Sequence, residues 1–166
     1  MPYLIRPATP EDAVAISRVV INALRQSNAQ DYSAEIIAQV ARNFSPEAIL
    51  QRLAQRQVFV AIGAGQVLAT ASLDQDVVRS VFVEPSQQGL GIGKQLMAHL
   101  QRIALDQGCD RLRVPSSLTA QGFYAALGYD VVRDEFHGAE RTIIMEKVLL
   151  RYPPGPQHPR CQGPSA

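Results

Sequence analysis

A glycine-rich turn lies directly between a strand pattern and a helix pattern at residues 77–98, VVRSVFVEPSQQGLGIGKQLMA. Gly89, Gly91 and Gly93 can adopt positive φ angles and bring bare backbone close to a ligand. The helix that follows offers unpaired N–H groups and a partial positive charge at its N-terminus. A strand, a turn and a helix in this order predict a phosphate-binding loop.

The sequence of this turn can be compared with two common phosphate-binding loops. A Walker A loop requires a glycine where Gln88 stands and a serine or threonine where Gln95 stands. The dinucleotide fingerprint G-x-G-x-x-G, started at Gly89, requires a third glycine where Lys94 stands. Neither pattern fits, so the loop belongs to another class.

Other residues of the chain lack the neighbours that their chemistry needs. Neither His99 nor His137 stands at a metal-ligand spacing from a cysteine or a carboxylate, so no metal site is expected. Ser116 and Ser117 lack the G-x-S-x-G turn of a serine hydrolase. Tyr32 is interpreted as a packing residue.

Apolar spacing, capping residues and turn residues predict the elements that position the loop. Residues 1–150 are expected to form one domain, and the proline- and glycine-rich residues 151–166 a flexible tail. The expected helices span residues 9–26, 33–43, 45–55, 93–106 and 119–127, and the expected strands span residues 3–6, 58–62, 67–73, 77–83, 111–114, 129–135 and 141–147.

The charge balance of the chain limits its partners. Lysine and arginine total 16 against 15 acidic residues, which gives no broad basic surface for nucleic acid or an anionic membrane. The N-terminus lacks the charged start and apolar core of a signal peptide, so a cytoplasmic location is expected. The sequence does not decide between a monomer and a homodimer.

Four segments of the chain match a known family in order and spacing. Gln88–Gly93 fits the pattern Q/R-x-x-G-x-G/A, and Val81–Pro85 before it is a hydrophobic strand that ends in proline. Residues 117–129 fit S-x-x-A-x-x-F-Y-x-x-x-G-F/Y, and Met145–Lys147 fits M-x-K. Together these segments resemble the GNAT superfamily of N-acetyltransferases. The resemblance implies an α+β class, the GNAT acyl-CoA acyltransferase fold, with a mixed, mostly antiparallel sheet of about seven strands flanked by helices.

The resemblance also implies the ligands and their contacts. Acetyl-CoA would be the cosubstrate, and the acceptor would be a primary amine of a small molecule, an amino acid or a peptide. Backbone groups of Phe82 and Val83 would pair with the pantetheine arm like an added strand. Ser117 and Tyr124 would lie along that arm near the sulfur. The diphosphate would be held by backbone N–H groups of the loop, namely those of Gln88, Gly89, Leu90, Gly91, Ile92, Gly93 and Lys94.

The expected chemistry assigns roles to a few side chains. An acceptor ammonium with a pKa near 10.4 must lose a proton before it attacks the thioester. Asp76 is the candidate base, with Asp74 second. Backbone N–H groups around Val81–Val83 would stabilise the oxyanion, as in the resembling family. Tyr124 is the candidate acid for the leaving thiolate, because a phenol keeps its proton at pH 7.

A second function stays open at this point, because the base is not clearly defined. The chain could instead be a non-catalytic acyl-CoA-binding module that senses or regulates. The intact Tyr124 favours the enzyme.

Overall fold

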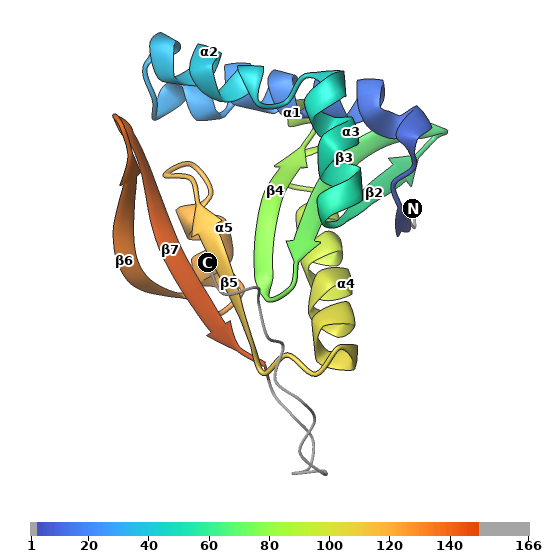
Figure 1. Ribbon diagram of the computed structural model, residues 1–166, viewed down its shortest axis with the longest axis vertical. Coiled ribbons are helices and arrows are strands. Elements are labelled where there is room, and N and C mark those ends of the chain that lie inside the picture. The colour runs from blue at the N-terminus through green and yellow to red at the C-terminus, as the bar shows by residue number, and fades with distance from the viewer. Residues whose placement is uncertain (1–2, 150–166) are drawn as a thin grey trace.

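In the computed structural model, which describes residues 3–149, the chain forms a seven-stranded sheet with the strand order β1-β2-β3-β4-β5-β7-β6 (Figure 1). Neighbouring strands are antiparallel except β4 and β5, which are parallel. This architecture confirms the predicted α+β fold, and the expected tail at 151–166 lies outside the described residues. The strands are β1 (Leu4–Pro7), β2 (Gln57–Gly63), β3 (Gln66–Asp74), β4 (Val77–Val83), β5 (Arg111–Ser116), β6 (Asp130–His137) and β7 (Glu140–Val148).

The helices begin close to the predicted positions. Ser33 and Ser45 cap α2 and α3, because their hydroxyls accept hydrogen bonds from the backbone N–H groups of Ile36 and Ala48, each at 3.2 Å. The first helix begins later than predicted, because residues Pro10–Asp12 form a separate 3-10 turn. The helices are α1 (Ala13–Gln26), α2 (Ala34–Arg42), α3 (Pro46–Gln55), α4 (Ile92–Asp106) and α5 (Gln121–Ala126).

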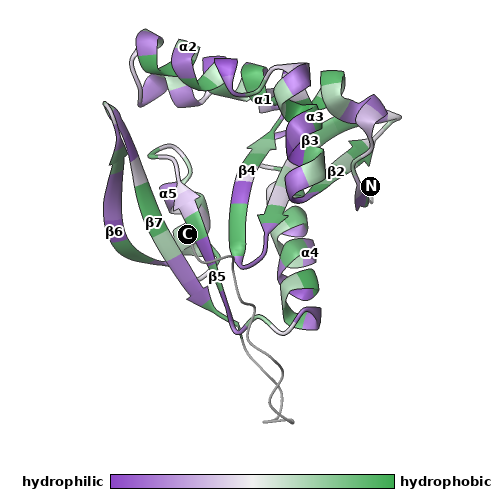
Figure 2. Ribbon diagram, viewed as in Figure 1, coloured by the Kyte–Doolittle hydropathy of each residue, from purple (hydrophilic) through white to green (hydrophobic). Residues whose placement is uncertain are grey.

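The sheet separates two hydrophobic cores. Val58 and Val60 of β2 pack with α1, α2 and α3 on one face, whereas Phe59 and Ala61 pack with α4 and α5 on the other. Each helix therefore carries an apolar and a hydrophilic side, as the mixed colours along α2 and α4 show (Figure 2). Within residues 3–149, no helix combines the length and apolar content that a membrane crossing requires.

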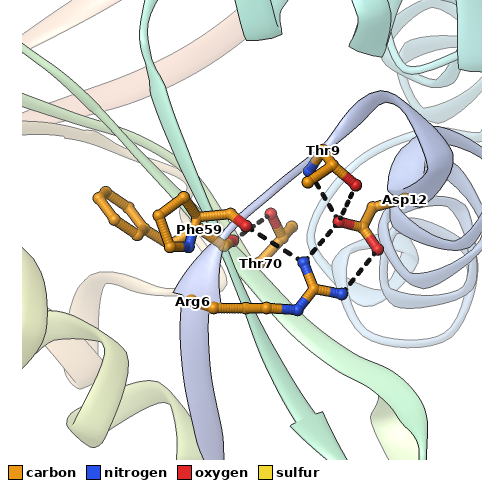
Figure 3. Close-up of polar contacts among 6 residues, drawn as sticks. Arg6, Thr9, Asp12, Phe59 and Thr70 are labelled. Atoms are coloured by element: carbon orange, nitrogen blue, oxygen red, sulfur yellow. Dashed lines mark hydrogen bonds and ion pairs between the residues drawn. The ribbon is translucent and has the colours of Figure 1, made fainter.

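A buried carboxylate fixes the entry of the chain into α1 (Figure 3). The Arg6 guanidinium donates two hydrogen bonds to Asp12, from Nη1 to Oδ2 at 2.8 Å and from Nη2 to Oδ1 at 3.0 Å. The backbone N–H of Thr9 donates to Asp12 Oδ2 at 2.8 Å. The hydrogen bonds from Arg6 favour the ionised carboxyl and hold the pKa of Asp12 below its ordinary value.

We expect Asp12→Asn to lower the free energy of unfolding by about 1 to 2 kcal/mol at pH 7, a modest value because Arg6 is partly exposed. Folding favours the ionised carboxyl, so the stabilisation is complete above the unfolded-state pKa near 3.9 and is lost as the pH falls through the lower folded-state pKa. Urea unfolding of both proteins between pH 7 and pH 2 measures the difference. A difference that does not shrink in acid would contradict the assignment.

The sheet opens between β4 and β5. Within the described chain, the pairing of these two strands is confined to Val77 and Arg113, and beyond this pair the strands diverge (Figure 1). On its other edge β4 carries a bulge, because Arg79–Phe82 of β4 lies opposite Thr70–Ser72 of β3. Ser80 in this bulge has a positive φ of 56°. The divergence and the bulge together shape the site.

Candidate active site

A cleft of about 710 Å³ lies where β4 and β5 separate. Its walls come from the ends of α1 and α2, from α3, from β4 and its following loop, from β5 and α5, and from β6 and β7. The cleft therefore joins segments from almost every part of the described chain. Its volume lies within the range of ligand-binding pockets in proteins.

The glycine-rich loop forms one end of the cleft, and two of its three glycines adopt the positive φ angles that the sequence predicts. Gly89 and Gly91 have φ angles of 80° and 88°, in the left-handed region. Gly91 is the N-cap of α4, and no side chain caps this helix end. The first N–H groups of α4 therefore have no partner within the helix and are available to an anion at the cleft.

Gly93 is required for a different reason, which is space. A Cβ atom at this position would lie 3.2 Å from Cζ of the Phe123 ring, closer than most real contacts. Gly93 thus allows α4 to pack closely against α5 beside the cleft. The loop is also tied to its surroundings, because Gln88 Nε2 donates to the Val83 carbonyl at 3.3 Å and to the Ser27 hydroxyl at 3.0 Å.

Almost all residues predicted to contact the cofactor line this one cleft. Leu90 is the exception, since the residue is 59% exposed and lies outside the lining. Ser117 lines the cleft and also caps the turn before α5, where its hydroxyl accepts a hydrogen bond from the N–H of Ala120 at 3.1 Å. The lining set is Phe82, Val83, Gln88, Gly89, Gly91, Ile92, Gly93, Lys94, Ser117 and Tyr124.

Tyr124 reaches the cleft from α5 and is only 3% exposed. Its ring packs edge-on against Phe123 and Tyr129, with centroids 5.1 and 5.6 Å away. Burial, with a smaller contribution from Tyr129, raises the pKa of the Tyr124 phenol well above its ordinary value. The hydroxyl is therefore protonated at neutral pH and can donate a proton or hydrogen bond into the cleft.

The structure does not bring the predicted base, Asp76, to the cleft. Asp76 lies in the β3–β4 turn, where β4 and β5 are still paired, and its carbonyl accepts a hydrogen bond from Arg113 N at 2.9 Å. The second candidate, Asp74, forms an ion pair with Arg79 at 3.3 Å. Neither carboxylate lines the cleft, so neither is placed to accept the proton of an amine bound there.

The acidic side chain that does line the cleft is on the opposite wall. Among residues 3–149, Glu140 is the only acidic residue of the lining, and it is half-buried at the start of β7. His137 lines the cleft beside it, at the end of β6. No sequence pattern distinguishes Glu140 from other strand residues.

A polar bridge crosses the cleft between the α1–α2 connection and the opposite wall. The Tyr32 hydroxyl donates to the Arg141 carbonyl at 2.8 Å and accepts from the Leu118 N–H at 2.7 Å. Thr119 Oγ1 donates to Asp31 at 2.8 Å. Burial raises the pKa of Tyr32, so this phenol stays protonated and keeps both contacts. Tyr32 is therefore more than the plain packing residue that the sequence suggests.

Comparisons with known proteins identify the fold and family. The acetyltransferase (GNAT) domain matches residues 28–149 of this chain. The uncharacterized N-acetyltransferase YafP of Escherichia coli K12 is 26% identical over 131 residues, which cover 79% of this chain and 83% of YafP. The structure of a GCN5-related N-acetyltransferase from Rhodopseudomonas palustris is 26% identical, with a TM-score of 0.85 over 90% of this chain and 97% of that one.

A further solved structure has the same fold at lower identity. PaiA N-acetyltransferase from Thermoplasma acidophilum, determined in complex with coenzyme A, is 21% identical, with a TM-score of 0.76 over 89% of this chain and 99% of that one. The split sheet with a glycine-rich loop at its opening is thus the architecture of an acetyltransferase. The chain belongs to the GNAT family of N-acetyltransferases.

Proposed function

We propose that this protein transfers an acetyl group from acetyl-CoA to a primary amine of a small molecule, an amino acid or a peptide, by direct attack in a ternary complex. The observation that carries the proposal is one cleft that is lined by the uncapped N-terminus of α4, the unpaired edge of β4 and a protonated phenol. Membership of the family and the coenzyme A complex of the Thermoplasma relative support the choice of cosubstrate.

The cosubstrate would lie along the open edge of β4. Its diphosphate would accept hydrogen bonds from N–H groups of the loop between Gln88 and Lys94, where the α4 dipole also favours negative charge. Its pantetheine arm would extend the sheet by pairing with backbone groups of Phe82 and Val83. This binding mode uses the polar edge of β4 that the divergence from β5 leaves unpaired.

The reaction would begin when the unprotonated amine attacks the thioester carbonyl. The new C–N bond converts the carbonyl into a tetrahedral oxyanion, for which backbone N–H groups around Val81–Val83, next to the bulge, are the donors. Collapse breaks the C–S bond, and Tyr124 supplies a proton to the departing thiolate. Glu140 takes the place of Asp76 as the group that accepts the amine proton, through water.

Release of coenzyme A with a panel of amines tests this proposal. We expect thiol release that depends on the amine, with one N-acetylated product formed for each thiol, measured by a thiol reagent and mass spectrometry. Calorimetric titration of acetyl-CoA in the same buffer provides the binding control. Binding of acetyl-CoA without amine-dependent release across a broad panel would instead support the non-catalytic sensor.

A further inference from the structure

Three arginines line the cleft on its α3 side. Arg52 and Arg56 come from the last turn of α3 and the residue that follows it, and Arg79 comes from β4 immediately before the bulge. Arg79 pairs with Asp74 at 3.3 Å. The guanidinium groups of Arg52 and Arg56 have neither an ion-pair partner nor a hydrogen-bond acceptor within residues 3–149.

These guanidinium groups are partly desolvated and lie close to one another. Burial lowers the pKa of Arg52, and burial together with the charges of Arg52 and Arg79 lowers the pKa of Arg56, with Asp74 opposing. Arg52 lies over the Phe44 ring, 4.3 Å from its centroid. Its Nη1 atom is fully buried without a hydrogen-bond partner. Packing on Phe44 satisfies the face of this guanidinium but not its in-plane N–H groups.

Unpaired cations at a cavity wall lower the stability of the protein unless a ligand compensates them. Among the described residues, Glu140 on the β7 wall is the only acidic residue that lines the cleft. The cleft itself therefore supplies little negative charge to balance these arginines. Guanidinium groups form their strongest hydrogen bonds with the paired oxygens of carboxylate and phosphate. The uncompensated charge therefore fits an oxyanion group of a ligand.

Arg52, Arg56 and Arg79 together are called the arginine cluster here. The position of this cluster assigns the oxyanion to the acceptor. The glycine-rich loop follows the C-terminal end of β4, whereas Arg79 lies four residues before Val83, roughly 13 Å along a strand at about 3.3 Å per residue. The cluster is thus separate from the diphosphate site. Arg79 is only two residues, roughly 7 Å, from Val81 beside the proposed oxyanion donors. An amine at the thioester and an anion at the cluster fit within one small molecule.

Resting on the proposed function, we propose that Arg52, Arg56 and Arg79 bind a carboxylate or phosphate group of the acceptor, so that the enzyme acetylates small amines that carry an oxyanion a few bonds from the nitrogen. The geometry favours amino acids and phosphorylated amino alcohols over polyamines, simple alkylamines and lysine side chains. The attraction acts on the acceptor and leaves the acyl-transfer step unchanged.

Matched pairs of acceptors that differ only in the oxyanion test the inference. The pairs are phenylalanine with 2-phenylethylamine and glycine with methylamine for carboxylate, and phosphoethanolamine with ethanolamine for phosphate. The measured quantity is the ratio of kcat/KM within each pair. We expect at least one pair to favour the anionic member by about tenfold or more, and Arg56→Gln to reduce that ratio by roughly 10- to 100-fold. Arg56→Lys should restore part of it.

Arg102→Gln is the matched control, because Arg102 is exposed on α4, which packs on the other face of the sheet. This variant should keep the wild-type ratio. Wild-type ratios near or below one in all pairs, with the neutral amines acetylated, would overturn the inference and leave the proposed function intact. That comparison needs no variant, so it holds even if Arg56→Gln fails to fold.

If the proposed function is wrong, the result is different, because no amine then causes release of coenzyme A. Calorimetric binding of N-acetylphenylalanine, N-acetylglycine and N-acetylphosphoethanolamine, each against its neutral partner in the presence of coenzyme A, then decides the inference separately. Binding of an anionic member that is at least tenfold tighter and is lost in Arg56→Gln supports the cluster as an oxyanion site. Equal affinities within every pair overturn it.

Discussion

Tyr124→Phe is expected to lower kcat by roughly ten- to a thousand-fold, about 1.4 to 4 kcal/mol of transition-state stabilisation, while acetyl-CoA affinity stays within a few-fold. The substitution removes only the hydroxyl, so the edge-on ring contacts with Phe123 and Tyr129 remain. Burial raises the pKa of this phenol, so the hydroxyl keeps its proton at neutral pH. Steady-state kinetics with a good acceptor and calorimetry with acetyl-CoA provide the two measurements.

Tyr129→Phe is the control that the chain itself offers. Tyr129 is a buried tyrosine next to Tyr124, but it lies outside the cleft lining and its hydroxyl is buried without a hydrogen-bond partner. Removing this hydroxyl should leave kcat unchanged and keep or raise the free energy of unfolding, because no hydrogen bond is lost. If Tyr124→Phe also leaves kcat unchanged while chemistry is rate-limiting, the thiolate leaves without Tyr124, and its proton comes from water.

Gly91→Val is expected to weaken acetyl-CoA binding by about ten- to a hundred-fold. Space is not the cause, since a Cβ atom at Gly91 would meet no other atom within 4 Å. The φ of 88° is the cause, because a β-branched residue strongly disfavours it and the loop must change conformation. Loss of one charged hydrogen bond to the diphosphate, about 1.5 to 3 kcal/mol, accounts for this change in affinity. Calorimetric titration measures it.

Gly65→Val separates binding from stability. Gly65 has a φ of 74° in the β2–β3 turn, a Cβ atom there would also meet no other atom within 4 Å, and the residue lies outside the cleft. The two substitutions should therefore impose similar backbone strain, seen as similar losses in the free energy of unfolding. Only Gly91→Val should change acetyl-CoA affinity. Equal affinities in both variants and wild type would show that the loop does not hold the diphosphate.

The loop could be predicted because its signals are local. Positive φ at Gly89 and Gly91, and the start of a helix directly after them, depend on neighbouring residues in the chain. The caps at Ser33 and Ser45 are local in the same sense. Gly93 is the contrasting case, because a glycine is needed there to let the Phe123 ring of another helix pack closely. The sequence alone does not show whether a glycine is needed for a positive φ angle or for close packing.

The position of Asp76 relative to the cleft could not be predicted for a related reason. Asp76 precedes β4 in the sequence, but the sequence does not tell which end of β4 stays paired with β5. The strands pair at Val77, so the cleft opens farther along β4 and away from Asp76. Glu140 and Arg56 meet the cleft from segments 84 residues apart, and no spacing rule connects them. Whether residues so far apart in the sequence line one cleft depends on how the helices pack on the sheet.

The divergence of β4 from β5 also links the lifetime of the folded protein to its ligand supply. A ligand that fills the opening binds the native chain and not the unfolded one, so the melting temperature rises with ligand concentration. At a hundred times the dissociation constant, the added stability is about 2.7 kcal/mol, comparable to a sizeable core substitution. Resistance of the purified protein to proteolysis is therefore expected to rise with the concentration of acetyl-CoA or coenzyme A, the ligands proposed above.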